Sequence, residues 1–139
     1  MTRLVKDAMT AGAATVRPEA SLVEVAQLMR DQDIGDVVVA DGDAVVGVIT
    51  DRDVTVRAVA GGVDPVSVSA GAVCTRRPVL ITPDAPVDDA VTLMRENAVR
   101  RLPVVEDGRP VGVLSLGDLA RERDPRSALA EISRAAPDR

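Results

Sequence analysis

The sequence predicts an α/β protein, in the α+β sense, made of two tandem copies of one β-α-β-β-α unit. Sliding the chain by 65 residues aligns residues 10–53 with residues 75–118 without a gap, so the chain repeats itself. Both copies alternate short β-branched runs with stretches that carry apolar residues at helical spacing. Both copies also end on glycine, two apolar residues, Thr or Ser, two variable residues and Asp, at residues 47–53 and 112–118.

The first half of each copy is expected to form a short extended segment followed by a helix. The extended segments are residues 14–17 and 79–82, and a turn that contains proline follows each of them. In the first copy, Ser21 and Glu24 have the spacing of a capping box, and apolar residues recur at helical spacing behind them. The second copy has the same apolar spacing, with Pro86 near the helix start. Each helix should therefore turn one apolar face to a core.

The second half of each copy is expected to form a β-hairpin that runs into a second helix. Each hairpin begins with a near-continuous apolar run, as a buried strand requires, and an Asp-Gly turn leads to its second strand. The predicted strands are residues 37–40 and 45–50 in the first copy and residues 102–105 and 111–115 in the second, and the predicted helices are residues 51–60 and 116–123.

Glycines mark two kinds of position in this chain. Gly47 and Gly112 hold the same strand position in the two copies, which predicts a close approach of backbone or of a ligand there. Gly61 and Gly62 instead end the last helix of the first copy, which places a linker after it. The predicted division is a first unit at residues 1–63, a linker at residues 64–71, a second unit at residues 72–124, and a closing helix and tail at residues 125–139.

The composition excludes several classes of function. The chain has a net charge of −5, one Cys, and no His, Phe, Tyr or Trp. Without histidine the commonest general base and metal ligand are missing, so we expect neither an enzyme nor a metal site. A nucleic-acid binder would show a basic stripe or aromatic platforms, and neither half does. An apolar run of about 18 residues and a signal-peptide core are also missing, and Cys74 cannot form an internal disulfide, so we expect a cytoplasmic protein that does not enter a membrane.

The motif at residues 47–53 and 112–118 predicts a strand that leads directly into the N-terminus of a helix. Its hydroxyl residue stands three positions before its acid, which is the spacing of a capping box. Such a helix start has unpaired N–H groups and a partial positive charge, which suit a phosphate. Two interpretations remain open. The hydroxyl and the acid could only cap a helix, which is worth about 1 kcal/mol, or they could also bind a ligand.

This tandem unit, closed by the repeated motif, resembles the pair of cystathionine-β-synthase (CBS) domains known as a Bateman module. Residues 7–10, 101–105 and 50–53 add to the resemblance, and the last of these matches an ending seen in many small bacterial members. The chain is similar to stand-alone CBS proteins of actinobacterial hypoxia or stress responses. The resemblance implies two units related by pseudo-twofold symmetry and a non-enzymatic regulatory or sensor function. It also implies an adenine nucleotide, such as AMP, ADP or ATP, in clefts between the units, with Mg²⁺ only beside the nucleotide and no required cofactor.

The resemblance also implies roles for individual residues. The closing aspartate would hold the ribose hydroxyls, the Ser or Thr would face phosphate, and residues before the hairpin of the other copy would flank the base. Because Arg100 suits a phosphate and the Gly35-Asp36 pair does not, we expect unequal clefts, with the Asp53 cleft the tighter. The Asp53 cleft would comprise Thr50, Asp53, Thr75, Leu80, Val99 and Arg100, and the Asp118 cleft would comprise Thr10, Thr15, Ile34, Gly35, Ser115 and Asp118.

The predicted helices also bear on assembly. Residues 22–29 and 87–94 are rich in Val, Ala and Met, and so small a module cannot cover all of this apolar surface by itself. We therefore expect a homodimer, which the resemblance also implies. The alternative function is a ligand-free dimeric interaction protein that docks on an unknown protein partner.

Overall fold

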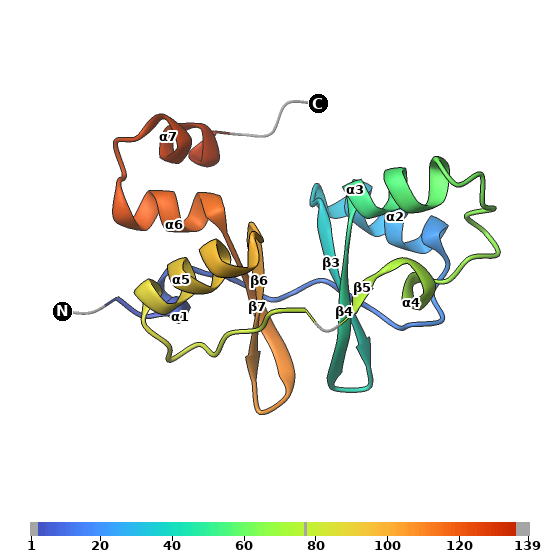
Figure 1. The fold of residues 1–139 in the computed structure, drawn as a ribbon, viewed down its shortest axis with the longest axis horizontal. Helices are drawn as coiled ribbons and strands as arrows, with labels where there is room; N and C mark the ends of the chain where they lie inside the picture. The colour runs from blue at the N-terminus through green and yellow to red at the C-terminus, as the bar shows by residue number, and fades with distance from the viewer. Residues whose placement is uncertain (1–2, 77, 136–139) are drawn as a thin grey trace. The chain divides into compact units, whose positions relative to one another are not determined.

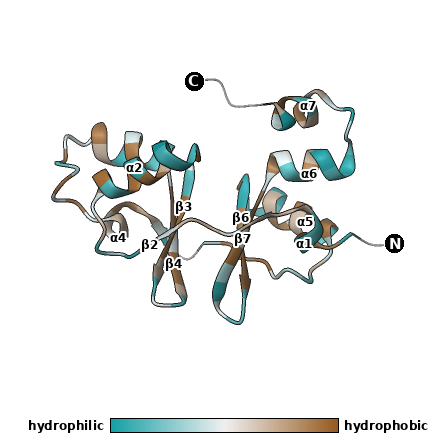
Figure 2. Ribbon diagram, turned by 180° about the vertical axis from the view of Figure 1, so that it is seen from behind, coloured by the Kyte–Doolittle hydropathy of each residue, from teal (hydrophilic) through white to brown (hydrophobic). Residues whose placement is uncertain are grey.

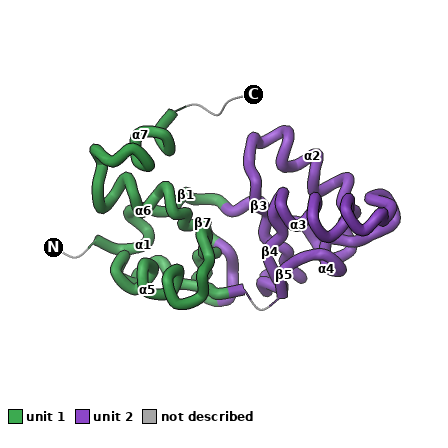
Figure 3. Tube along the Cα trace, turned by 45° about the horizontal axis from the view of Figure 1, so that its top comes forward, with its two compact units in different colours: residues 1–12, 79–107, 111–139 green, residues 13–78, 108–110 purple. Residues whose placement is uncertain are grey.

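The structure is a computed structural model that describes residues 3–76 and 78–135 of the chain (Figure 1). The chain forms two compact units (Figure 3). Each unit is a small sheet covered by helices, which confirms the predicted mixed α/β fold class. Among the described residues, unit 1 contains residues 3–12, 79–107 and 111–135, and unit 2 contains residues 13–76, 78 and 108–110.

Unit 2 is built on a four-stranded sheet in the order β2-β3-β4-β5. Strands β2 and β3 are parallel, and the other neighbouring pairs are antiparallel. The central hairpin confirms the predicted strands, and α2 confirms the predicted first helix. The elements of unit 2 are β2 (Thr15–Val16), α2 (Leu22–Gln32), β3 (Asp36–Asp41), β4 (Ala44–Thr50), α3 (Asp51–Asp53), η1 (Val54–Val59), α4 (Ala70–Val73) and β5 (Thr75–Arg76).

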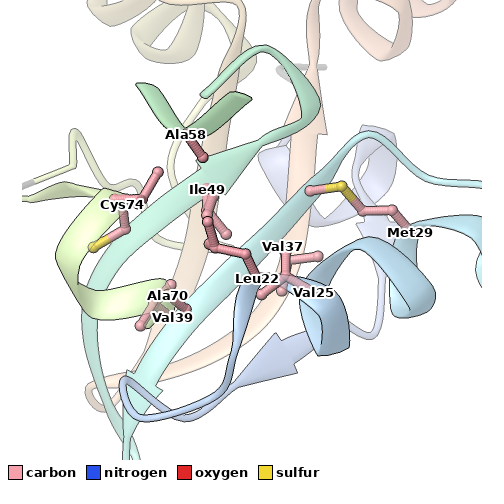
Figure 4. Packing of buried hydrophobic residues seen from close by; sticks show 10 residues of the cluster. Leu22, Val25, Met29, Val37, Val39, Ile49, Ala58, Ala70 and Cys74 are labelled. Atoms are coloured by element: carbon pink, nitrogen blue, oxygen red, sulfur yellow. The ribbon is translucent and has the colours of Figure 1, made fainter. Parts of the chain in front are cut away.

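The core of unit 2 follows from the apolar spacing of its elements. Hydrophobic and hydrophilic segments alternate along α2 (Figure 2), and its apolar stripe packs on the inner face of the β3–β4 hairpin (Figure 4). Ser21 begins α2, because its hydroxyl accepts a hydrogen bond of 3.2 Å from the Glu24 N–H. The buried cluster consists of Leu22, Val25, Met29, Val37, Val39, Ile49, Ala58, Ala70, Val73 and Cys74.

Unit 1 is built on a three-stranded sheet in the order β1-β7-β6. Its core contains Leu102, Val104 and Leu114 from the hairpin and Val87, Ala90 and Met94 from α5. Among the described helices of both units, none combines the length and the apolar character needed to cross a bilayer. The elements of unit 1 are α1 (Val5–Ala8), β1 (Thr10–Ala11), α5 (Val87–Asn97), β6 (Arg101–Glu106), β7 (Arg109–Ser115), α6 (Leu116–Arg123) and α7 (Ala128–Arg134), although the first two residues of β7 belong to unit 2.

Each compact unit combines the leading segment of one repeat with the body of the other. In unit 1, the helix α1 and the strand β1 of the first repeat join the second: the Val5 N–H donates to the Ala85 carbonyl at 2.8 Å, and Thr10 pairs with Val113. In unit 2, the equivalent α4 and β5 of the second repeat join the first, and Thr75 pairs with Val48. The predicted division follows the repeat in the sequence, whereas the compact units follow the packing.

The second helix of the first repeat differs from its prediction. Residues 51–60 were expected to form one α-helix, but a single α-turn, α3, is followed by the π-helix η1, in which the Ala60 N–H donates to the Thr55 carbonyl at 2.9 Å. The Thr55 hydroxyl donates to the Asp51 carbonyl at 3.0 Å, a back-bond that bends helices. The β-branched residues that follow Asp53 also disfavour regular α-helix.

Two further segments differ from their predictions. Of the predicted extended segment at residues 79–82, only Ile81 pairs with the sheet, through a parallel bridge to Val104. The predicted linker at residues 64–71 ends inside α4, where Ala70 is fully buried. The closing helix is confirmed as α7, whereas residues 136–139 of the predicted tail lie outside the described residues.

Candidate functional site

The repeated motif forms a strand-to-helix junction in unit 2. The strand β4 ends at Thr50, and α3 begins at the next residue. The Thr50 hydroxyl accepts a hydrogen bond from the Asp53 N–H at 3.1 Å, and the Asp53 carboxylate accepts one from the Thr50 N–H at 2.9 Å. This reciprocal pair confirms the predicted capping box.

Unit 1 repeats the same junction between β7 and α6. The Ser115 hydroxyl accepts from the Asp118 N–H at 3.1 Å, and Asp118 Oδ2 accepts from the Ser115 N–H at 2.9 Å. In both junctions, therefore, the Oδ2 atom of the aspartate serves as a helix cap. The Oδ1 atom of each aspartate takes no part in the cap.

The two Oδ1 atoms lie in different surroundings. Asp53 Oδ1 forms an ion pair with Arg57 Nε at 3.7 Å, which is longer than a hydrogen bond, and the Asp53 side chain is 15% exposed. Arg57 directs its Nη1 atom elsewhere, to the Val73 carbonyl at 3.1 Å. Asp118 is only 4% exposed, and its Oδ1 atom accepts a hydrogen bond from Arg121 Nη2. The two junctions thus have the same cap and an arginine on the same helix, but Asp53 is the more exposed carboxylate and is held less closely by its arginine.

The sequence interpretation missed the two arginines that cause this difference. Arg57 stands four residues after Asp53, and Arg121 stands three residues after Asp118. Both spacings place the arginine on the same helix face as the acid, which is a signal that the sequence carries. The third missed residue is Ser133, which contacts Arg121 from α7. Its sequence separation from Asp118 gives no such signal.

Gly47 and Gly112 lie where β4 and β7, the strands that lead to the two junctions, closely approach their neighbours β5 and β1. A Cβ atom on Gly47 would lie 2.5 Å from the Thr75 carbonyl oxygen and 2.8 Å from Cys74 Sγ. A Cβ atom on Gly112 would lie 2.6 Å from the Thr10 carbonyl oxygen. The prediction of a close approach at these glycines is confirmed, and the approaching group is backbone.

Unit 2 brings together part of the predicted site. Thr75 lies on β5 beside β4, the strand that leads to Thr50 and Asp53. The Gly35 carbonyl accepts from the Asp51 N–H at 3.0 Å, so Gly35 lies at the start of α3. Thr15 lies on β2, which β3 separates from β4. The remaining predicted residue of this unit, Ile34, precedes Gly35 and donates its N–H to the Met29 carbonyl at 3.0 Å.

Unit 1 holds the other predicted residues. The Arg100 carbonyl accepts from the Leu116 N–H at 2.9 Å, so Arg100 lies at the start of α6 just as Gly35 lies at the start of α3. Val99 and Arg100 line a groove of about 580 Å³ between α5 and α6. Thr10 lies on β1 beside β7, and Leu80 precedes Ile81 on the approach to β6. The pairing of residues from the two units into clefts stays a prediction.

The described part of the chain has no cluster of side chains suited to bind a metal ion. Within residues 3–76 and 78–135, no three His, Cys, Asp or Glu side chains gather where they could hold a metal ion. Cys74 is buried in the core of unit 2, and burial raises the pKa of its thiol above the ordinary value. At neutral pH this side chain is therefore a packed, protonated thiol.

Cys74 provides a test of this burial. We expect its reaction with a thiol reagent such as DTNB at pH 8 to be on the order of 100-fold slower in the native protein than in guanidinium chloride, because the reagent needs an open state and a thiolate. The release of the reagent's chromophore measures both rates. Equal rates in the two conditions would show that Cys74 is not in the core.

Three comparisons with known proteins agree with this fold and these repeats. The CBS domain family matches residues 5–59 and 70–124. Hypoxic response protein 1 of Mycobacterium tuberculosis is 33% identical over 131 residues, which cover 94% of this chain and 91% of that protein. CBS domain-containing protein YhcV of Bacillus subtilis is 38% identical over 136 residues, which cover 93% of this chain and 94% of that protein.

A solved structure shares the arrangement as well. The CBS domain pair of protein MJ0100, in complex with 5′-methylthioadenosine and S-adenosyl-L-methionine, is 26% identical with a TM-score of 0.80, and the match covers 91% of this chain and 100% of that chain. The family matches fall once on each sequence repeat. Because the relatives are also matched over nearly their whole length, this protein belongs to the CBS domain family, as a CBS domain pair.

Proposed function

We propose that this CBS domain pair is a non-enzymatic regulatory or sensor module that binds an adenine nucleotide, such as AMP, ADP or ATP. The Asp53 carboxylate supports the proposal most directly, because its Oδ1 atom has no cation within hydrogen-bond distance among the described residues. A carboxylate can accept from both ribose hydroxyls, and the start of α3 beside it suits a phosphate. The CBS domain pair of MJ0100 holds two adenosine compounds, which gives the ligand class a precedent.

The other residues predicted from the sequence complete the proposal. Thr50 would face phosphate and Arg100 would offset its charge, since a guanidinium is suited to phosphate oxygens. Mg²⁺ would enter only with a nucleotide that carries it, and no separate cofactor is required. Around Asp53 the proposed contacts are Thr50, Thr75, Leu80, Val99 and Arg100, and around Asp118 they are Thr10, Thr15, Ile34, Gly35 and Ser115.

Calorimetry tests the proposal directly. The chain has no Trp or Tyr whose fluorescence could report binding. Titration with AMP, ADP, ATP, NAD and S-adenosylmethionine should identify at least one ligand that binds below millimolar concentration. If none of the five binds at millimolar concentration, the nucleotide function is wrong. The alternative of a ligand-free interaction protein would then take its place.

Arg100 should separate phosphate recognition from nucleoside recognition. We expect Arg100→Ala to weaken AMP and ATP binding by about tenfold, because one charge-assisted hydrogen bond is lost, and to leave adenosine binding nearly unchanged. Calorimetric titration of all three ligands measures the difference. Arg126→Ala, which removes an exposed arginine in the turn before α7, is the matched charge control. Equal losses for AMP and adenosine would contradict the proposed role of Arg100.

We also propose that the protein acts as a homodimer. Both units expose large apolar side chains: Val59 is 69% exposed and Val66 is 70% exposed in unit 2, and Ile132 is 71% exposed in unit 1. Exposed apolar surface on a small protein commonly marks an interaction site. Light scattering should give about twice the mass of the 14.5 kDa chain at micromolar concentration. A mass of one chain under these conditions would contradict the dimer.

A further inference from the structure

The helix α7 packs on α6 (Figure 1), the helix that begins at the Asp118 junction. Ala130 on α7 is fully buried, and the Ser127 hydroxyl begins the helix by accepting from the Ala130 N–H at 3.0 Å. Ser133 contacts Gly117, the residue just before Asp118. The Ser133 Cβ atom would lie only 3.1 Å from a Cβ atom built on Gly117, so the absence of a side chain there leaves room for α7.

Arg121 connects α7 to the aspartate itself. Its Nη2 atom donates to Asp118 Oδ1, while its Nη1 atom donates to the Ser133 hydroxyl and, at 3.4 Å, to the Ser133 carbonyl. With the cap at Oδ2, both carboxylate oxygens of Asp118 accept a hydrogen bond inside unit 1. A ribose hydroxyl could take the place of Arg121 at Oδ1 only after Arg121 had moved.

The first repeat allows a comparison, because it has the same junction without a helix equivalent to α7 among the described residues. Arg52 occupies the position equivalent to Gly117, so a side chain is compatible with this helix turn where no helix lies on it. Val56 occupies the position equivalent to Arg121, and it is 49% exposed. The residues equivalent to α7 are 63–69, and they form no helix. Among the described residues, the Asp118 junction thus has α7 beside its arginine, whereas the Asp53 junction has only the ion pair with Arg57.

We infer that α7 and Arg121 form an internal lock on the Asp118 junction, which leaves Asp53 as the only nucleotide anchor until α7 is released. The inference rests on the proposed nucleotide function and adds its regulation. Release of α7 frees Asp118 Oδ1 and creates a second nucleotide site in the same chain. Whatever withdraws α7 therefore changes the number of nucleotides bound as well as their affinity.

The test measures two quantities: the number of AMP molecules bound per chain, and the hydrogen exchange of α7, which reports whether the helix stays packed. Gly117→Gln puts a helix-forming side chain where Ser133 lies, and Arg121→Gln removes the clamp without adding volume. Hydrogen exchange should become faster over residues 128–134 in both variants. The number of AMP sites per chain, measured by calorimetry, should rise from about one to about two. Arg126→Gln, an exposed substitution in the turn before α7, should change neither measurement.

Each other outcome contradicts the inference. Two sites in the parent protein would show that α7 does not close Asp118. Faster exchange with one remaining site would show that release does not create a site, and unchanged exchange in both variants would show that these contacts do not hold α7. If neither parent nor variants bind AMP while exchange still becomes faster, the proposed nucleotide function is what fails. Adding Asp118→Ala to Gly117→Gln should return the stoichiometry to about one.

Discussion

Replacing Asp53 with alanine is expected to weaken AMP and ATP binding by about 10- to 100-fold. The substitution removes a carboxylate that can accept from both ribose hydroxyls, and charge-assisted bonds of this kind contribute roughly 1.5–3 kcal/mol. Calorimetric titration measures the loss. Asp118→Ala should have the smaller effect on total binding, because Arg121 already occupies the Oδ1 atom of Asp118.

Two variants control this experiment. Asp53→Asn keeps an oxygen that can accept from the Thr50 N–H, so it separates the loss of charge from the loss of the helix cap. Asp31→Ala removes the same charge from an exposed position on α2. If Asp53→Ala binds nucleotide as tightly as Asp31→Ala does, Asp53 is a helix cap and nothing more.

Gly112→Val should lower the melting temperature more than any conservative change on β7. Its side chain would meet the Thr10 carbonyl oxygen and Met9 Sδ, which lie 2.6 and 2.9 Å from the position of a Cβ atom. Thr10 cannot retreat without disturbing the pairing of β1 with β7. We expect a cost of about 1–3 kcal/mol, which corresponds to a fall of roughly 4–12 °C.

Thermal unfolding followed by circular dichroism measures this effect, because helix content does not depend on aromatic residues. Val113→Ile, at the neighbouring half-buried position, adds one methylene to an existing side chain and is the matched control. Gly47→Val should behave like Gly112→Val, because the Thr75 carbonyl oxygen lies 2.5 Å from its Cβ position. Equal melting temperatures for Gly112→Val and Val113→Ile would contradict the close approach.

The repeat made most of the fold predictable from the sequence. The helix over residues 116–123 and the hairpins were found because apolar periodicity and capping residues act locally. The capping boxes at Thr50 and Ser115 were found for the same reason, since a hydroxyl and an acid three residues apart bond to each other's backbone. The glycines Gly47 and Gly112 were found because two copies of the sequence agree on them.

The π-helix in the first repeat was not predicted, because apolar spacing over so short a segment does not distinguish a π-helix from an α-helix. The bond from the Thr55 hydroxyl to the Asp51 carbonyl does not account for it alone, since Thr92 makes the same bond to Asp88 within the regular helix α5. The sequence also did not show that the leading segment of each repeat packs against the other repeat. The strands β1 and β5 are two residues each, too short to show a pattern, and only packing assigns them to a sheet.

Two equivalent junctions, each with a hydroxyl, an acid and a helix start, can be predicted from the repeat alone. The packing around the two junctions makes them different. Asp118 lies under Arg121 and Ser133, and the latter is brought there by a helix that begins ten residues after Asp118. Capping depends on neighbours within one turn, so the sequence can show it, whereas the cover on a carboxylate depends on which distant segment packs against it.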